Sequence, residues 1–160
     1  MFIFILIISL LTACTKSSYW SEERIHSHSD TYTFCKVRQR ASDPVHGLDI
    51  EFVRFADGVK AYLIVHSTPI PCHLCPAEKT PLHIEIDQVH SFYAERLEGG
   101  QRFLLPSEAT ELLKQAFLSG KNALITLPGY HSLIDAEGFS KYFKKIEERP
   151  WMENPFHLPY

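Results

Sequence analysis

The stretch Leu48–His66, LDIEFVRFADGVKAYLIVH, decides the fold class of this 160-residue chain. From Leu48 to Phe52 apolar and acidic side chains alternate, and a period of two residues is typical of a half-buried β-strand. A second β-rich run, Val59–His66, follows directly after Asp57-Gly58. Asp-Gly between two such runs is one of the strongest short hairpin signals. The stretch therefore predicts an antiparallel β-hairpin.

Further β-rich stretches flank this hairpin on both sides. Some are rich in Thr and aromatic residues, others alternate, and others are short apolar runs between turn residues. The run Gln88–Leu97 is ambiguous between helix and strand, but Gly99-Gly100 before the next run favours a second hairpin. The additional predicted strands are Thr31–Arg38, Leu82–Asp87, Gln88–Leu97, Arg102–Leu105 and Asn122–Leu127.

Two amphipathic helices are predicted in the C-terminal half, each from apolar residues at i, i+3, i+4 and i+7. The first has Ser107 as its expected N-cap and Gly120 as the glycine that ends it. The second has Asp135 as its expected N-cap and ends at Pro150. The apolar stripes are Ala109, Leu112, Leu113, Ala116 and Phe117 in the first helix, and Phe139, Tyr142, Phe143 and Ile146 in the second.

These elements predict an α+β fold: a single domain, residues 31–160, with an antiparallel β-sheet of about six strands and an extended C-terminal tail. The composition is 45% hydrophobic and 22% charged, as in ordinary globular proteins. The net charge is −3 and no block of Lys and Arg stands out, so we expect no nucleic-acid partner.

The N-terminus carries an apolar run, Phe2–Leu11, followed by Leu11-Thr12-Ala13-Cys14. This tetrapeptide resembles the lipobox of bacterial lipoproteins. The resemblance implies that residues 1–13 are a signal peptide that is removed, that the sulfur of Cys14 receives a diacylglyceryl group, and that the protein meets a membrane through this lipid anchor. A short uncleaved anchor and an ordinary secretory signal are the alternatives.

The residues after the cysteine add to this interpretation. Thr15 stands where lipoproteins held at the inner membrane commonly have Asp, so the resemblance implies the outer membrane, facing the periplasm. Residues 15–30 are polar and Ser-rich without a sustained period, so we expect residues 14–30 to be a lipidated N-terminus and flexible tether.

Three cysteines remain once Cys14 is lipidated: Cys35, Cys72 and Cys75. In an oxidising compartment they allow one intramolecular disulfide and leave one thiol. We expect Cys35 to pair with Cys72 or Cys75. The alternative is a thiol-redox centre at Cys72-X-X-Cys75, although no helix is expected after Cys72 to lower its pKa.

A metal site is a further alternative, because the loop around Cys72 is close in sequence to histidines. Cys72, His73, Cys75 and His83 are the candidate ligands, and their sulfur and nitrogen atoms suit zinc or copper. Against this, the chain has no second Cys-X-X-Cys pair. No cofactor is otherwise expected.

No catalytic constellation is recognisable, and the motifs of hydrolase elbows, zinc proteases and phosphate-binding loops are lacking from the sequence. Residues 111–146 resemble the C-terminal part of invasion-associated locus B type secreted proteins through Leu112-Leu113, Gly120-Lys121, Ala123–Leu127 and Gly138-Phe139. This resemblance implies an exported β-rich domain. The sequence thus favours a lipid-anchored envelope protein that binds a protein partner or serves envelope assembly, with a thiol-redox or metal-handling lipoprotein as the alternative.

Overall fold

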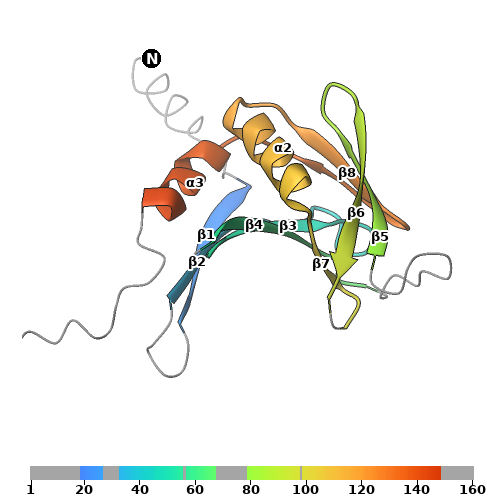
Figure 1. Ribbon diagram of the computed structural model, residues 1–160, viewed down its shortest axis with the longest axis horizontal. Helices are drawn as coiled ribbons and strands as arrows, with labels where there is room; N and C mark the ends of the chain where they lie inside the picture. The colour runs from blue at the N-terminus through green and yellow to red at the C-terminus, as the bar shows by residue number, and fades with distance from the viewer. Residues whose placement is uncertain (1–18, 27–32, 56, 68–78, 98, 149–160) are drawn as a thin grey trace, which may run out of the picture.

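A computed structural model of the chain describes residues 19–26, 33–55, 57–67, 79–97 and 99–148. Within them, nine antiparallel strands form one sheet in the order β1-β2-β3-β4-β7-β6-β5-β8-β9 (Figure 1). The strands are β1 (Trp20–His26), β2 (Thr33–Gln39), β3 (Asp49–Phe55), β4 (Gly58–Ile64), β5 (Lys79–Glu85), β6 (Val89–Arg96), β7 (Arg102–Leu104), β8 (Ala123–Leu127) and β9 (Tyr130–Ile134). The helices are α2 (Ser107–Leu118) and α3 (Phe139–Glu148).

The predicted α+β class is confirmed, with a larger sheet than the expected six strands. The hairpin of β3 and β4 forms as the Asp57-Gly58 signal predicts, with Phe55 opposite Gly58 at its turn. The ambiguous run before Gly99-Gly100 is the strand β6, which pairs with β7 as the hairpin prediction requires. Local alternation and turn residues were therefore reliable signals in the middle of the chain.

The first strand of the sheet lies where we expected part of the tether, and that expectation is wrong for residues 20–26. β1 pairs with β2 along its full length, from Trp20 opposite Gln39 to His26 opposite Thr33. Trp20 is 1% exposed, and its indole N–H donates to the carbonyl of Asp135 at 2.6 Å. The strand was missed because the residues between Trp20 and His26 are polar except for Ile25 and show no sustained alternation.

The strand β9 was also missed. It follows β8 after the two-residue turn Pro128-Gly129 and pairs with it from Leu127–Tyr130 to Ala123–Ile134. Its burial alternates, with Tyr130 and Ile134 buried and Leu133 exposed. Only one face of this edge strand meets the core, so its sequence is mixed.

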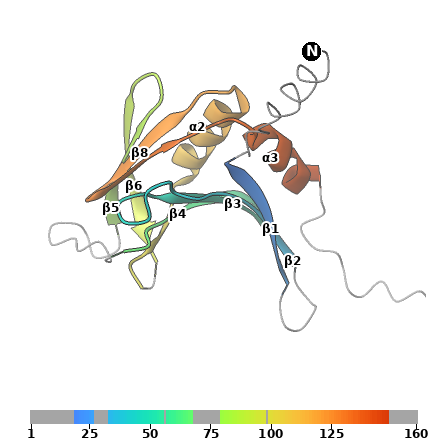
Figure 2. The ribbon, with the colours of Figure 1, turned by 180° about the vertical axis from the view of Figure 1, so that it is seen from behind.

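Both helices pack on the same face of the sheet, which curves around them (Figures 1 and 2). A cluster of aromatic rings fills the space between the helices and strands β1 and β3. The ring centroids of Trp20 and Phe139 are 4.8 Å apart, and those of Phe52 and Phe139 are 5.1 Å apart. Phe117 from α2 and Phe143 from α3 join the same cluster. These rings are the centre of the hydrophobic core.

Both expected N-caps are wrong. α2 begins at Ser107 itself, with Pro106 as its N-cap, and no side chain caps it. α3 begins at Phe139, because Asp135 closes a separate turn by accepting a hydrogen bond from the N–H of Glu137 at 2.8 Å.

The expected end of α2 is confirmed. Gly120 has φ +78°. The N–H of Gly120 donates to the carbonyl of Phe117, and that of Lys121 donates to the carbonyl of Ala116. These two bonds are the Schellman pattern, which needs a left-handed residue at this position.

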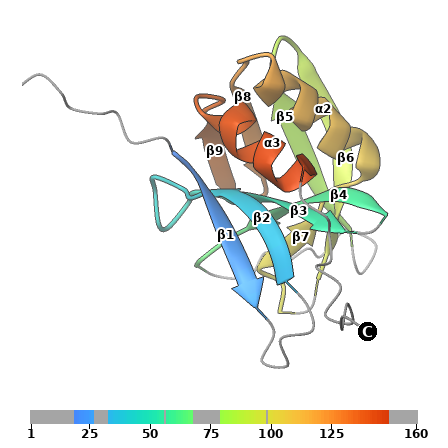
Figure 3. The same cartoon turned by 90° about the vertical axis from the view of Figure 1, so that its left-hand side faces the viewer.

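The two ends of the curved sheet approach each other. The contact of Trp20 with Asp135 joins β1 to the end of β9. The N–H of Leu48 donates to Oγ of Ser132 at 2.7 Å, and the N–H of His131 donates to the carbonyl of His46 at 3.0 Å. The start of β1, the connection between β2 and β3, and β9 therefore lie on one side of the molecule, as Figure 3 shows.

Candidate functional site

An open cleft of about 740 Å³ lies where β7 ends. This volume is within the range typical of ligand sites in proteins. Apolar side chains make up much of its lining, and charged residues stand around them. The lining residues are Asp57, Val59, Lys60, Lys79, Tyr93, Glu95, Leu104, Leu105, Pro106, Ser107 and Thr110. We call this pocket the β7 cleft.

The register of the sheet explains the β7 cleft. Leu104 of β7 lies between Tyr62 of β4 and Glu95 of β6. Two residues further along, the same register would place position 106 between Lys60 and Tyr93. Proline has no N–H to donate, and at Pro106 the chain turns into α2. Among the described residues no strand therefore fills this position, which leaves a gap between the start of β4 and β6.

Two strand edges face this gap. The N–H of Leu105 donates to the carbonyl of Ala61, and the N–H of Leu97 donates to the carbonyl of Arg102, so residues 61 and 97 direct backbone groups toward β7. Because backbone direction alternates along an antiparallel strand, Val59 and Tyr93 direct their N–H and C=O groups the same way, into the gap. The register therefore indicates that backbone groups of Val59 and Tyr93 point toward the cleft, whose lining also includes the apolar residues Leu104 and Leu105.

Charged groups at the rim of the cleft are exposed. Nζ of Lys60 lies 2.8 Å from a carboxylate oxygen of Asp57. This hydrogen bond raises the pKa of Lys60 and lowers the pKa of Asp57 from their ordinary values. Lys79 stands opposite Glu95 in the register of β5 and β6. The rim therefore carries both positive and negative groups. This mixed charge does not favour a strongly charged ligand of either sign.

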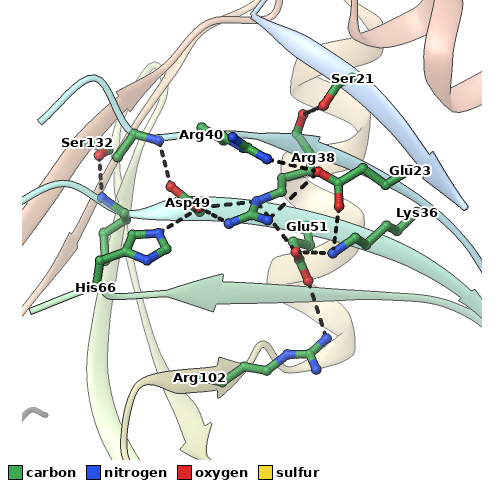
Figure 4. Close-up of polar contacts among 12 residues, drawn as sticks. Ser21, Glu23, Lys36, Arg38, Arg40, Asp49, Glu51, His66, Arg102 and Ser132 are labelled. Carbon is green, nitrogen blue, oxygen red and sulfur yellow. Dashed lines mark hydrogen bonds and ion pairs between the residues drawn. The ribbon is translucent and has the colours of Figure 1, made fainter. Parts of the chain in front are cut away.

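A second polar site lies on the face of the sheet away from the helices (Figure 4). It centres on Asp49, which is 2% exposed. Its carboxylate accepts hydrogen bonds from the N–H of Ala41 at 2.7 Å and from the guanidinium of Arg38, and Nε2 of His66 lies 2.7 Å away. Burial by itself would raise the pKa of Asp49, but the bonds from Ala41, Arg38 and His66 outweigh it and hold the pKa of that carboxyl below its ordinary value.

Glu51 extends this ionic cluster along β3. Nζ of Lys36 lies 2.6 Å from its carboxylate, and Arg102 lies 3.4 Å from it. Glu23 of β1 lies 3.1 Å from Lys36. Burial acts to raise the pKa of Glu23, but the hydrogen bond and charge of Lys36 lower it overall. Each buried carboxylate thus has a cationic partner, and we interpret the cluster as a structural tie between β1, β2, β3 and β7.

The structure describes two of the candidate ligand and disulfide residues. Cys35 lies on β2, packs against the core and forms no disulfide with another residue of the described ranges. His83 lies on β5, exposed, with Nδ1 3.0 Å from Oγ of Ser91. Strands β3, β4, β7 and β6 separate β2 from β5 in the sheet, so the two residues are not brought together.

Cys14, Cys72, His73 and Cys75 lie outside the described residues. Their lipidation, disulfide and metal roles therefore stay predictions. Within the described ranges, no three His, Cys, Asp or Glu side chains gather in a way that could hold a metal ion.

Sequence reasoning missed both the β7 cleft and the ionic cluster. For the cleft, the signal was the position of Pro106 only four residues after Arg102 in the sequence, which limits β7 to three residues. For the cluster, the signal was the alternation of cations Lys36 and Arg38 on one strand and of Asp49 and Glu51 on the next. Register places these charges opposite one another only once β2 is aligned with β3.

Comparisons with protein-family models, curated proteins and solved structures find no match to this chain. Among the described residues, neither helix has the length and apolar character needed to cross a membrane.

Proposed function

We propose that this protein is a lipid-anchored protein of the bacterial cell envelope that binds an extended segment of a protein partner in the β7 cleft. The observation that supports the binding role is the β7 cleft between β4 and β6, which Val59 and Tyr93 line. The register of β7 directs the backbone groups of these two residues toward the position that β7 leaves empty. A peptide that adds a strand to a sheet gains main-chain hydrogen bonds, while neighbouring pockets select its side chains. The anchor rests on the likeness of Leu11–Cys14 to a lipobox, and the outer membrane, facing the periplasm, is the proposed location.

If the peptide adds a strand to the sheet, its affinity should depend on its backbone N–H groups. An array of 12-residue linear peptides supplies the probe, and its tightest binder is resynthesised with single N-methyl groups along its length. Because the peptide would lie between two strands, its successive N–H groups face β4 and β6 in turn, so N-methylation should weaken binding at every consecutive position within the cleft and leave positions outside the cleft unchanged. Isothermal titration calorimetry measures this. An alternating response would indicate pairing with one strand edge alone, and no response at any position would exclude strand addition.

Tyr93 tests the location of the same site. Tyr93 is 61% exposed, so Tyr93→Ala should leave the fold intact and weaken the array-selected peptide about 10-fold or more, as truncation of an aromatic contact residue does. Val89→Ala is the matched control, because Val89 is 62% exposed on the same face of β6 and lies outside the cleft. Equal affinities for the two variants would place the peptide elsewhere.

The anchor is tested separately by the intact mass of the protein purified from bacterial membranes. We expect a chain that begins at Cys14 and carries a diacylglyceryl group, with or without an additional N-acyl chain. A mass that retains residues 1–13, or lacks lipid on Cys14, would contradict the lipoprotein interpretation and leave the peptide-binding test standing.

A further inference from the structure

The position of β1 shortens the link between the proposed anchor and the folded chain. The expected tether extended to residue 30, but Trp20 is already buried in the core. Five residues, 15–19, separate Cys14 from Trp20. Even fully extended, the step from Cys14 to Trp20 spans at most about 20 Å. A lipid on Cys14 therefore holds the start of β1 close to the membrane surface.

Exposed apolar side chains gather on the side at which β1 begins. Tyr19 is 54% exposed, and Leu133 of β9 is 67% exposed; both line the narrow pocket between the ends of the curved sheet. Val45, 50% exposed, lies in the connection between β2 and β3, next to His46, which binds His131 of β9. Figure 3 shows the start of β1, this connection and β9 on the same side of the molecule.

Charged groups of both signs lie among these apolar side chains. Arg40, whose side chain is 74% exposed, lines the same pocket as Tyr19 and Leu133. Asp43 carries the opposite charge in the same connection, and its carboxylate accepts the N–H groups of Val45 and His46. Arg40 also lies 3.7 Å from a carboxylate oxygen of Glu23, and Asp135 lines the same pocket. A tyrosine beside aliphatic side chains suits the headgroup region of a bilayer.

We propose that this side of the protein, the anchor face made of Tyr19, Arg40, Val45 and Leu133, lies directly against the phospholipid headgroups. The inference rests on the lipid anchor of the proposed function. It adds that the domain has one fixed orientation on the membrane.

This orientation determines where the β7 cleft opens. β3 and β4 run from the anchor face, at Asp49 and Ile64, to their turn at Phe55 and Gly58. The strands are seven residues long, roughly 20 Å. Asp57, Val59 and Lys60 at the turn line the cleft. The cleft therefore opens at the end of the hairpin far from the lipid, toward a partner in the aqueous compartment.

Paramagnetic relaxation tests the orientation. The mature protein, acylated on Cys14, is placed in nanodiscs of phosphatidylethanolamine and phosphatidylglycerol at a ratio of about 3:1, with and without a gadolinium-chelating lipid. We expect gadolinium to remove the amide signals of Arg40, His131 and Leu133. The amide signals of Asp57 and Tyr93, at the cleft, are the internal controls and should persist.

The possible outcomes distinguish a wrong orientation of the domain from a missing lipid anchor. Equal loss of signal at both ends of the molecule, or loss at the cleft alone, would overturn the orientation while the anchor stands. An unmodified Cys14 in the mass of the same preparation would overturn the anchor and, with it, the orientation. Loss confined to the anchor face supports both.

Discussion

Replacing Trp20 with alanine should lower the free energy of unfolding by about 3–5 kcal/mol, the range for removing a large aromatic side chain from a core. Trp20 is 1% exposed, and its ring lies 4.8 Å from that of Phe139 and 5.5 Å from that of Phe117. Trp20→Ala would also remove the indole N–H that binds the carbonyl of Asp135, which joins the two ends of the sheet. Urea unfolding followed by circular dichroism measures the change.

The neighbouring Tyr19 is the matched control. It is 54% exposed, so Tyr19→Ala should change the free energy of unfolding by no more than about 0.5 kcal/mol. A tether that includes both residues would instead predict no effect of either substitution. Equal, small effects of Trp20→Ala and Tyr19→Ala would therefore indicate that residues 20–26 belong to the tether. They would contradict the nine-stranded sheet.

Replacing Asp49 with alanine should lower the free energy of unfolding by about 1.5–3 kcal/mol, because the guanidinium of Arg38 loses its closest carboxylate and keeps only the longer contacts with Glu51 and Glu23. The N–H of Ala41 would lose its acceptor as well. Asp57→Ala is the matched control: its ion pair with Lys60 is exposed, so its loss should change the free energy of unfolding far less than Asp49→Ala does. Urea denaturation of the two variants at pH 7 compares them directly. Equal losses would show that the cluster around Asp49 does not stabilise the fold more than a surface pair.

The lowered pKa of Asp49 also predicts how stability depends on pH. Folding favours the charged carboxylate, so its contribution is fully present above the unfolded pKa of about 3.9 and is lost as the pH falls through the lower folded pKa. Asp49→Asn lacks this contribution. The variant should therefore lose less stability than the natural chain as the pH falls from about 5 to 3, while Glu23 still titrates in both. Parallel pH profiles would contradict the assignment to Asp49.

Much of the fold could be predicted from short stretches of sequence. The Asp57-Gly58 turn, the alternation after Leu48 and the Gly120 helix end are signals contained within a few residues of one another. The backbone conformation that each requires is local, so each needs no knowledge of the rest of the chain. The candidate site could be predicted less well from the sequence. The cysteine-based expectations fall mainly outside the described residues, and the β7 cleft depends on where three separate strands stop.

Periodicity and turn chemistry act between near neighbours in the chain, so the α+β class, the central hairpins and the two amphipathic helices could be predicted from the sequence alone. Tertiary structure alone decided that residues 20–26 form a strand, because Trp20 is buried by Phe139 and bonded to Asp135, more than a hundred residues away. It likewise decided the β7 cleft, which exists because β4 and β6 continue where β7 has ended. Such features depend on contacts between distant segments, and no local pattern encodes them.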